Sequence, residues 1–166
     1  MIVIDTQIWI YLLEPNAREN ENVRKYLEGN KDDGILITEK IGLNPIIPIE
    51  VAHNLFGNSK LNTNNLHNAL VEIFNAENIS IFDINQNIMS KALGILKNYR
   101  GKGIGGRDSL ILATMVQENI STIITHDKNI LSLSELNRID PVFNPPLKLE
   151  IDDTFDFTNF KKMVKI

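Results

Sequence analysis

The sequence predicts an α/β protein in which helices pack against a mainly parallel sheet. Short apolar runs at residues 2–4 and 122–125 are typical of strands buried on both faces. Segments with helical spacing separate such runs, and a connection between parallel strands needs a helix to return the chain. With 166 residues, 43% of them apolar, the chain can bury one substantial core but is too short for two ordinary domains.

The first elements follow from simple patterns. A strand is expected over residues 2–4 and ends at Asp5. An amphipathic helix should follow, and Pro15 should end it because proline cannot continue a helix interior. A second, more polar helix is expected over residues 18–28 and should stop near Gly29.

Residues 30–48 give a less regular pattern. Residues 35–38 favour a strand, and residues 46–48 leave a second strand open. Pro48 suits the first turn of a helix, with Glu50 near its start. The expected buried side of this helix consists of Ile49, Val51, Ala52 and Leu55.

The middle of the chain predicts two helices around a strand. The helices are expected over residues 64–78 and 88–99, and the strand over residues 79–84. Apolar residues recur at helical spacing in both helices. They are Leu66, Ala69, Leu70 and Ile73 in the first helix, and Met89, Ala92, Leu93 and Leu96 in the second.

The last part of the pattern begins with a glycine-rich stretch. Residues 100–107 are expected to be a loop, because a glycine in a helix interior costs about 1 kcal/mol. Asp108 should open a helix with a wide apolar face. Strands at residues 122–125 and 139–143 should flank a short helical turn through residues 130–131.

Composition limits the possible functions. The net charge of −4 argues against a protein that coats nucleic acid by bulk electrostatics, but it permits a nuclease that binds divalent cations. The absence of cysteine excludes disulfides, thiolate nucleophiles and sulfur-based zinc sites. No run approaches the roughly 20 apolar residues of a membrane span, and no signal peptide is recognisable. We therefore expect a soluble, cytoplasmic protein without a membrane partner.

Four acids fall where a parallel sheet places its ligands, at strand ends and helix starts. Asp5 and Asp127 follow strands, whereas Glu50 and Asp108 lie near helix starts. Each alone suits helix capping. Together they would repel, because a pair about 5 Å apart costs on the order of 3 kcal/mol at an effective dielectric of 20. Divalent cations remove that repulsion, and a set of oxygen ligands favours Mg²⁺ or Mn²⁺.

The order of these signatures resembles that of PIN-domain nucleases. An acid follows the first strand, another lies mid-chain, a helix begins Asp-x-x-Ile/Leu-x-Ala, and a Thr-x-Asp comes late. The matching segments are Val3-Ile4-Asp5-Thr6, Pro48-Ile49-Glu50, Arg107-Asp108-Ser109-Leu110-Ile111-Leu112-Ala113-Thr114 and Thr125-His126-Asp127. The resemblance covers residues 1–144 as a PIN-like nuclease domain and leaves residues 145–166 as a C-terminal extension.

The resemblance implies a three-layer α/β/α sandwich with about five parallel strands, and a metal-dependent endoribonuclease. Asp5, Glu50, Asp108 and Asp127 match the family's catalytic, metal-binding acids. Asp5 and Asp108 are expected to be the main ligands of Mg²⁺ or Mn²⁺, with Glu50 and Asp127 completing the shell or orienting water. The supporting positions are Thr6, Thr125 and Asn129.

The resemblance also bears on partners. Some relatives, called VapC, are toxins of toxin–antitoxin pairs, so an antitoxin and a homodimer are expected partners besides RNA. The apolar stripe of residues 64–78 and Leu55-Phe56 are expected to be core, and part of that surface is a candidate for the dimer contact. The long stretch over residues 30–48 departs from the compact form of the family. It leaves open whether the protein belongs with the VapC toxins or with another branch of the family.

Several charged residues have both structural and functional interpretations. Arg107 adjoins Asp108, and together with Arg100 and Lys102 it is a candidate contact to RNA phosphates, although solvated loop charges are the ordinary alternative. Among His53, His67 and His126, only His126 lies beside a candidate site residue. The tail carries basic and apolar residues that suit either a frayed terminus or docking.

Two other classes of protein remain to be separated from a nuclease. A non-catalytic PIN-like module would keep the fold and bind RNA or a protein without cutting. A phosphate-accepting receiver domain fits poorly, because it needs paired acids after the first strand, whereas Asp5 is followed by Thr6-Gln7.

Overall fold

The structure is a computed structural model and describes residues 1–29, 33–58 and 63–151. The tail residues with basic, apolar or acidic side chains lie outside the described residues. They are Asp152, Asp153, Asp156, Phe157, Phe160, Lys161, Lys162, Met163 and Lys165.

The described strands form a mainly parallel sheet. They are β1 (Val3–Ile4), β2 (Ile41–Leu43), β3 (Ile79–Ile81), β4 (Thr122–Ile124), β5 (Asn137–Asp140) and β6 (Leu147–Leu149). A four-stranded part has the order β1-β4-β5-β6, and β2 pairs with β3. A parallel bridge joins the two parts, since Ile2 N donates to Lys40 O at 2.9 Å and Gly42 N donates to Ile2 O at 2.8 Å. Only β6 pairs in the antiparallel direction, so the prediction of a mainly parallel sheet is confirmed.

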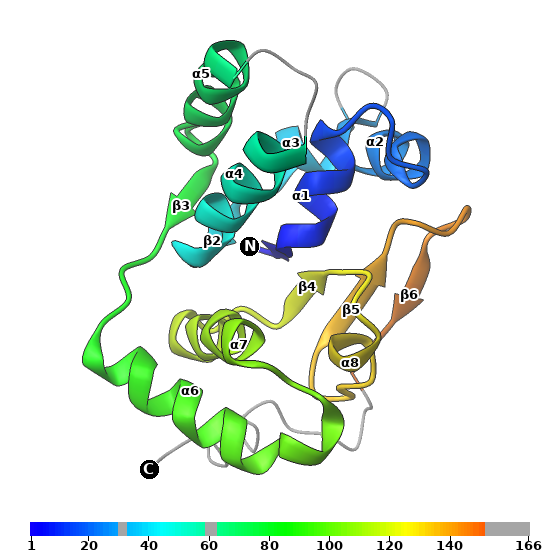
Figure 1. The fold of residues 1–166 in the computed structure, drawn as a ribbon. Coiled ribbons are helices and arrows are strands. Elements are labelled where there is room, and N and C mark those ends of the chain that lie inside the picture. Colours follow the sequence, from blue (N-terminus) through cyan, green and yellow to red (C-terminus); the bar gives the residue numbers. More distant parts are fainter. Residues whose placement is uncertain (30–32, 59–62, 152–166) are drawn as a thin grey trace.

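Helices cover both faces of this sheet, which confirms the predicted three-layer sandwich. Those described are α1 (Thr6–Leu13), α2 (Asn20–Glu28), α3 (Ile35–Thr38), α4 (Ile46–Asn58), α5 (Thr63–Phe74), α6 (Gln86–Asn98), the 3-10 helix η1 (Arg100–Lys102), α7 (Gly106–Glu118) and α8 (Lys128–Leu131). Figure 1 shows α1, α2, α4 and α5 on one side of the sheet and α6 and α7 on the other. None of the described helices is long and apolar enough to cross a membrane.

The strand predicted at residues 35–38 is wrong, because this segment is the helix α3. Its β-branched residues favour a strand, but tertiary contacts hold a turn: Asn78 Nδ2 donates to Leu36 O at 2.8 Å and to Glu39 O at 3.0 Å. The real strand of this region is β2, which contains Gly42. A Cβ at Gly42 would lie 2.8 Å from side-chain atoms of Ile120 and Phe82, so a larger residue there would have to displace these side chains.

The helix expected to begin at Pro48 begins at Ile46 instead. Asn44 at the end of β2 accepts a hydrogen bond from Ile46 N through its side-chain Oδ1 at 2.9 Å, which starts α4 one half-turn earlier. The second strand that the sequence left open at residues 46–48 does not form, because these residues belong to α4.

The predicted inner face of α4 is partly wrong. Ile49 is 64% exposed, whereas Ile47, Val51 and Leu55 form the fully buried row at a spacing of four. The same four-residue spacing selects the inner residues of α5, which are Leu66, Leu70 and Phe74, and leaves Ala69 exposed.

Several element boundaries differ from the prediction by a few residues. Strand β3 is shorter than residues 79–84, and β5 lies earlier than residues 139–143. Within the glycine-rich loop, η1 forms a turn, and α7 already begins at Gly106. Strand β6 lies beyond residue 144 and pairs with β5, while the division of the chain at this point stays a prediction.

Candidate active site

The four predicted acids line one cleft at the carboxyl ends of β1 and β4. These strands are parallel neighbours, with Val3 opposite Ile123 and Ile4 opposite Ile124, so the residues that follow them emerge at the same edge. Helices α4 and α7 supply the facing wall. The cleft has a volume of about 260 Å³ and is lined by Asp5, Thr6, Gln7, Ile10, Glu50, Asn54, Arg107, Asp108, Ile111 and Asp127.

Asp5 is fixed from both of its carboxylate oxygens. It is the N-cap of α1, and its Oδ1 accepts a hydrogen bond from Thr6 N at 2.7 Å. Its Oδ2 accepts from Thr125 Oγ1 at 2.7 Å, and the same hydroxyl accepts from Asp127 N at 3.0 Å. Thr125 is fully buried, and its two hydrogen bonds tie the end of β1 to the end of β4.

Burial makes the charge on Asp5 costly. Only 7% of this side chain is exposed, and the loss of solvation raises the pKa of the carboxyl group to about 6. The hydrogen bonds from Thr125 and Thr6 lower the pKa, while the negative charges of Asp108 and Asp127 raise it. The fold therefore holds several acids near Asp5, although their repulsion opposes its ionisation.

Asp108 and Asp127 each use one carboxylate oxygen for a helix start. Asp108 Oδ2 accepts from Gly105 N at 2.8 Å, which stabilises the beginning of α7. Asp127 Oδ1 caps α8 by accepting from Asn129 N at 2.7 Å and Ile130 N at 3.2 Å. Within the described part of the chain, Asp108 Oδ1 and Asp127 Oδ2 accept no hydrogen bond, so each acid keeps one free oxygen as a ligand.

The opposite wall is an ion pair. Glu50 Oε1 accepts from Arg107 Nη1 at 2.5 Å, and Glu50 Oε2 accepts from Thr6 Oγ1 at 3.1 Å. The guanidinium is 71% exposed, whereas Glu50 is only 13% exposed. Its hydrogen bond and charge interaction with Glu50 raise the pKa of Arg107, and the charges of Asp108 and Asp5 add to this. Three of the four acids therefore stabilise the positive charge of Arg107.

A buried amide joins the two helices of this wall. Asn44 Nδ2 donates to Thr114 Oγ1 of α7 at 2.8 Å, while its Oδ1 caps the start of α4. Asn44 is 1% exposed. It therefore fixes the separation between the helices that carry Glu50 and Asp108, although it does not line the cleft.

The supporting residues of the prediction are only partly placed at the cleft. Thr6 and Thr125 hold Glu50 and Asp5, respectively. Asn129 does not line the cleft: its backbone N–H donates to Asp127 Oδ1, and its side-chain N–H donates to Gly103 O at 3.2 Å.

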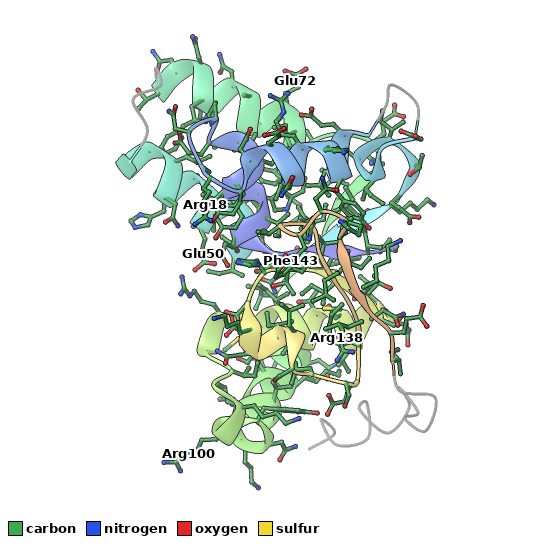
Figure 2. The ribbon with its side chains drawn as sticks, turned by 90° about the vertical axis from the view of Figure 1, so that its right-hand side faces the viewer. Arg18, Glu50, Glu72, Arg100, Arg138 and Phe143 are labelled. Carbon is green, nitrogen blue, oxygen red and sulfur yellow. The ribbon has the colours of Figure 1, made fainter. Side chains whose placement is uncertain are left out.

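Two of the three predicted phosphate contacts lie elsewhere. Lys102 Nζ is 3.9 Å from Glu135 and 5.2 Å from the centre of the Tyr99 ring. Figure 2 shows Arg100 far below Glu50 at the end of the molecule. Arg107 alone of these three lines the cleft.

The sequence interpretation missed Gln7, Ile10, Asn54 and Ile111. Two of them lie one helical turn beyond a predicted acid: Asn54 follows Glu50 by four residues and donates to its carbonyl oxygen at 2.8 Å, and Ile111 follows Asp108 by three. The spacing of a helical face could have identified these two, whereas Gln7 and Ile10 lie two and five residues after Asp5 and have no such signal.

The donor chemistry of the cleft fits Mg²⁺ or Mn²⁺. Its ligands are carboxylate oxygens, their mutual repulsion favours a divalent cation, and Asp108 and Asp127 keep free oxygens. Among residues 1–29, 33–58 and 63–151, no group of three or more acidic or histidine side chains is arranged so that it could hold a metal ion. Mg²⁺ keeps several waters and often uses one or two carboxylates, so two acids of the cleft are sufficient protein ligands.

Comparison with known proteins agrees with this geometry. The family model of the PIN domain matches residues 2–136, so the chain belongs to the PIN domain family. No curated protein matches the chain closely enough to count as a relative.

Solved structures share the fold. VapC20 from Mycobacterium tuberculosis, described as a sarcin-ricin loop cleaving toxin, has a TM-score of 0.65 and 12% identity over 80% of this chain and 94% of its own. A toxin–antitoxin complex from Klebsiella pneumoniae has a TM-score of 0.58 and 20% identity over 85% and 98%. FitAcB from Neisseria gonorrhoeae has a TM-score of 0.56 and 25% identity over 85% and 98%.

Proposed function

We propose that this PIN domain is a Mg²⁺- or Mn²⁺-dependent endoribonuclease. The observation that carries the proposal is the convergence of Asp5, Glu50, Asp108 and Asp127, from four separate elements, on one cleft. A fold would not accumulate that repulsion for helix capping alone. Binding of a cation that hydrolysis requires would give the four acids a common role.

Each residue of the cleft has a defined task in this proposal. Hydrolysis bonds the oxygen of water to phosphorus and breaks the bond between phosphorus and a ribose oxygen. One proton leaves the attacking water, and the ribose oxygen takes up one proton from solvent to become a hydroxyl. A divalent cation, when bound, neutralises phosphate charge and lowers the pKa of water. Asp5 and Asp108 would hold the cation, and Glu50 or Asp127 would orient the water and accept its proton.

The hydroxyls and the arginine complete the site. Thr125 keeps Asp5 turned toward Asp127, and Thr6 keeps Glu50 turned into the cleft. Arg107 is positioned to bind a phosphate of the substrate, because its exposed guanidinium lies at the mouth of the cleft beside Asp108.

We further propose that the protein is the toxin of a toxin–antitoxin pair and acts in the cytoplasm. The support comes from structural neighbours described as a sarcin-ricin loop cleaving toxin and as a toxin–antitoxin complex. An antitoxin protein is then the expected partner. A homodimer is also proposed, and the exposed Phe56 of α4 and Val71 of α5 are apolar residues that it would cover.

The test is cleavage of structured and unstructured RNA with and without Mn²⁺. We expect cleavage only with the metal, and we expect Asp5→Asn to abolish it while the protein stays folded. Asp83→Asn is the matched control, because Asp83 is exposed and lies outside the cleft. Full activity of Asp5→Asn would overturn the assignment, and a wild type that neither binds Mn²⁺ nor cuts would indicate a non-catalytic binding module.

A further inference from the structure

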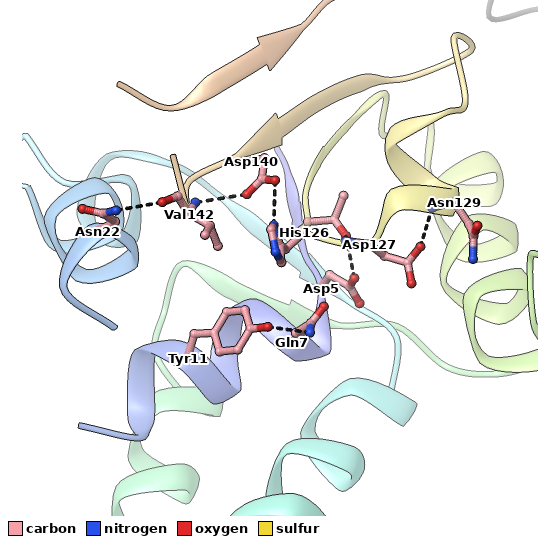
Figure 3. A network of polar contacts seen from close by, with 10 residues as sticks. Asp5, Gln7, Tyr11, Asn22, His126, Asp127, Asn129, Asp140 and Val142 are labelled. Carbon is pink, nitrogen blue, oxygen red and sulfur yellow. Dashed lines mark hydrogen bonds and ion pairs between the residues drawn. The ribbon is translucent and has the colours of Figure 1, made fainter. Parts of the chain in front are cut away.

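Three aromatic rings form a row beside the acidic cleft. The ring centres of Tyr11 and His126 are 6.2 Å apart, and those of His126 and Phe143 are 6.4 Å apart. Gln7, which lines the cleft, donates its side-chain N–H to Tyr11 Oη at 2.6 Å. His126 directly precedes Asp127 in the sequence. Figure 3 shows Gln7, Tyr11 and His126 next to Asp5, so the row starts at the site itself.

The row is held in place by a buried acid. His126 Nδ1 lies 2.7 Å from Asp140 Oδ2, and Asp140 is fully buried. Asp140 Oδ1 accepts from Val142 N at 3.0 Å, which shapes the turn that presents Phe143. Asn22 of α2 donates to Val142 O at 2.7 Å. Two elements therefore fix the backbone just before Phe143.

Phe143 is large, apolar and 52% exposed, although hydrogen bonds hold the backbone just before it. It also forms part of a small pocket of about 150 Å³ at the far end of the row. The pocket is lined by Asn22, Lys25, Tyr26, Phe143, Asn144 and Pro146. Among the described residues, Lys25 pairs with no carboxylate, so its charge is available to an anion.

We infer that the row from Tyr11 to Phe143 and this pocket form a subsite for unpaired nucleobases of the RNA substrate. Aromatic faces stack on bases, amides of asparagine match their polar edges, and a lysine meets the backbone phosphate. Bases in a duplex are already stacked and cannot enter such a pocket. The subsite therefore selects single-stranded RNA and leads it toward the four acids.

This inference rests on the proposed function, because it concerns the substrate of the same cleft. Its separate prediction is that Phe143 controls RNA binding but not metal binding. Removal of one stacking ring should raise the KM for single-stranded RNA roughly 5- to 150-fold, with a smaller effect on kcat. The binding of Mn²⁺ should not change, since Phe143 does not line the acidic cleft.

The experiment compares Phe143→Ala, Phe143→Leu and Phe143→Trp with the wild type. KM and kcat are measured with a single-stranded RNA and with a duplex of the same sequence, and Mn²⁺ binding is measured by calorimetry. Leu93→Ala is the matched control, because Leu93 is a 60% exposed apolar residue on α6 in the other helical layer. We expect tryptophan to preserve KM, alanine and leucine to raise it, and duplex cleavage to respond little.

Different failures have different meanings. If the wild type neither binds Mn²⁺ nor cuts RNA, the proposed function fails and the subsite fails with it. If the wild type is active but Phe143→Ala keeps its KM, only the subsite is overturned. If Phe143→Leu keeps the KM for single-stranded RNA as well as Phe143→Trp does, the subsite is also overturned. That result would indicate that Phe143 is an apolar contact with a protein partner.

Discussion

The two walls of the acidic cleft are built differently. The wall at the ends of β1 and β4 is buried, and its acids are held by backbone N–H groups and by the Thr125 hydroxyl. The wall on α4 and α7 reaches solvent and is held by the ion pair between Glu50 and Arg107. Backbone contacts fix one wall, whereas two long side chains define the other.

This difference separates two tasks. The buried wall is prepared for a cation, because Asp5 pays a solvation penalty that only a positive charge or a proton relieves. The open wall can rearrange, since Glu50 Oε1 cannot serve a cation while it holds Arg107. Metal binding should therefore depend mainly on the first wall and on Asp108, whose carboxylate is also held by a backbone N–H, and substrate binding on the Glu50–Arg107 ion pair.

The largest effect is expected for protein stability at the buried wall. The pKa of Asp5 is raised from 3.8 to about 6, so the folded protein binds this proton more tightly than the unfolded chain. The stabilisation is fully present below pH 3.8 and is lost as the pH rises through 6. Without metal, the free energy of unfolding of Asp5→Asn should rise relative to that of the wild type as the pH increases from 3.8 through 6. The gain should be at most about 3 kcal/mol by pH 8.

The measurement is urea unfolding of both proteins at several pH values with a chelator present. Groups far from Asp5 titrate alike in the two proteins, so the difference reports on Asp5 and the acids beside it. A difference that stays constant from pH 4 to pH 8 would contradict the raised pKa.

A smaller effect is expected when the bridge within the buried wall is removed. Thr125→Val deletes the hydroxyl that holds Asp5 and Asp127, and loss of such an orienting group costs roughly 10- to 100-fold in metal affinity. Calorimetric titration with Mn²⁺ measures this. Thr38→Val is the control, because its hydroxyl donates to Gly34 O at 3.0 Å in α3, outside the cleft. Equal Mn²⁺ affinities for the two variants would show that Thr125 does not position the ligands.

The smallest effect is expected at the open wall, where one substitution should strengthen Mn²⁺ binding and weaken RNA binding. Arg107→Gln removes a positive charge near the acids, so Mn²⁺ should bind more tightly, by about fivefold at low salt. The KM for RNA should rise several-fold because a phosphate contact is lost. Arg100→Gln is the matched control, since Arg100 lies away from the cleft (Figure 2). A weaker affinity for Mn²⁺ in Arg107→Gln would contradict the proposed division of tasks.

The sequence predicts the buried wall well because backbone order determines it. An acid directly after a buried strand must emerge at the carboxyl edge of the sheet, and that reasoning is sufficient to find Asp5 and Asp127. Helix starts identify Glu50 and Asp108 in the same way. All four then meet at one cleft.

The remaining features depend on contacts that the local sequence does not contain. The helix α3 is held by Asn78, which lies about 40 residues further along the chain. Lys102 turns to Glu135 and Asn129 turns to Gly103, although sequence position alone suggested a place at the site. Side-chain direction and long-range hydrogen bonds decide such cases, and neither has a periodic signature.

The central claim is that Asp5 and Asp108 share one cation. Anomalous diffraction from crystals grown with Mn²⁺ tests it directly. We expect a single strong peak in the cleft, about 2.1 Å from a carboxylate oxygen of each residue. Strong Mn²⁺ peaks elsewhere on the protein, with none between Asp5 and Asp108, would contradict the claim.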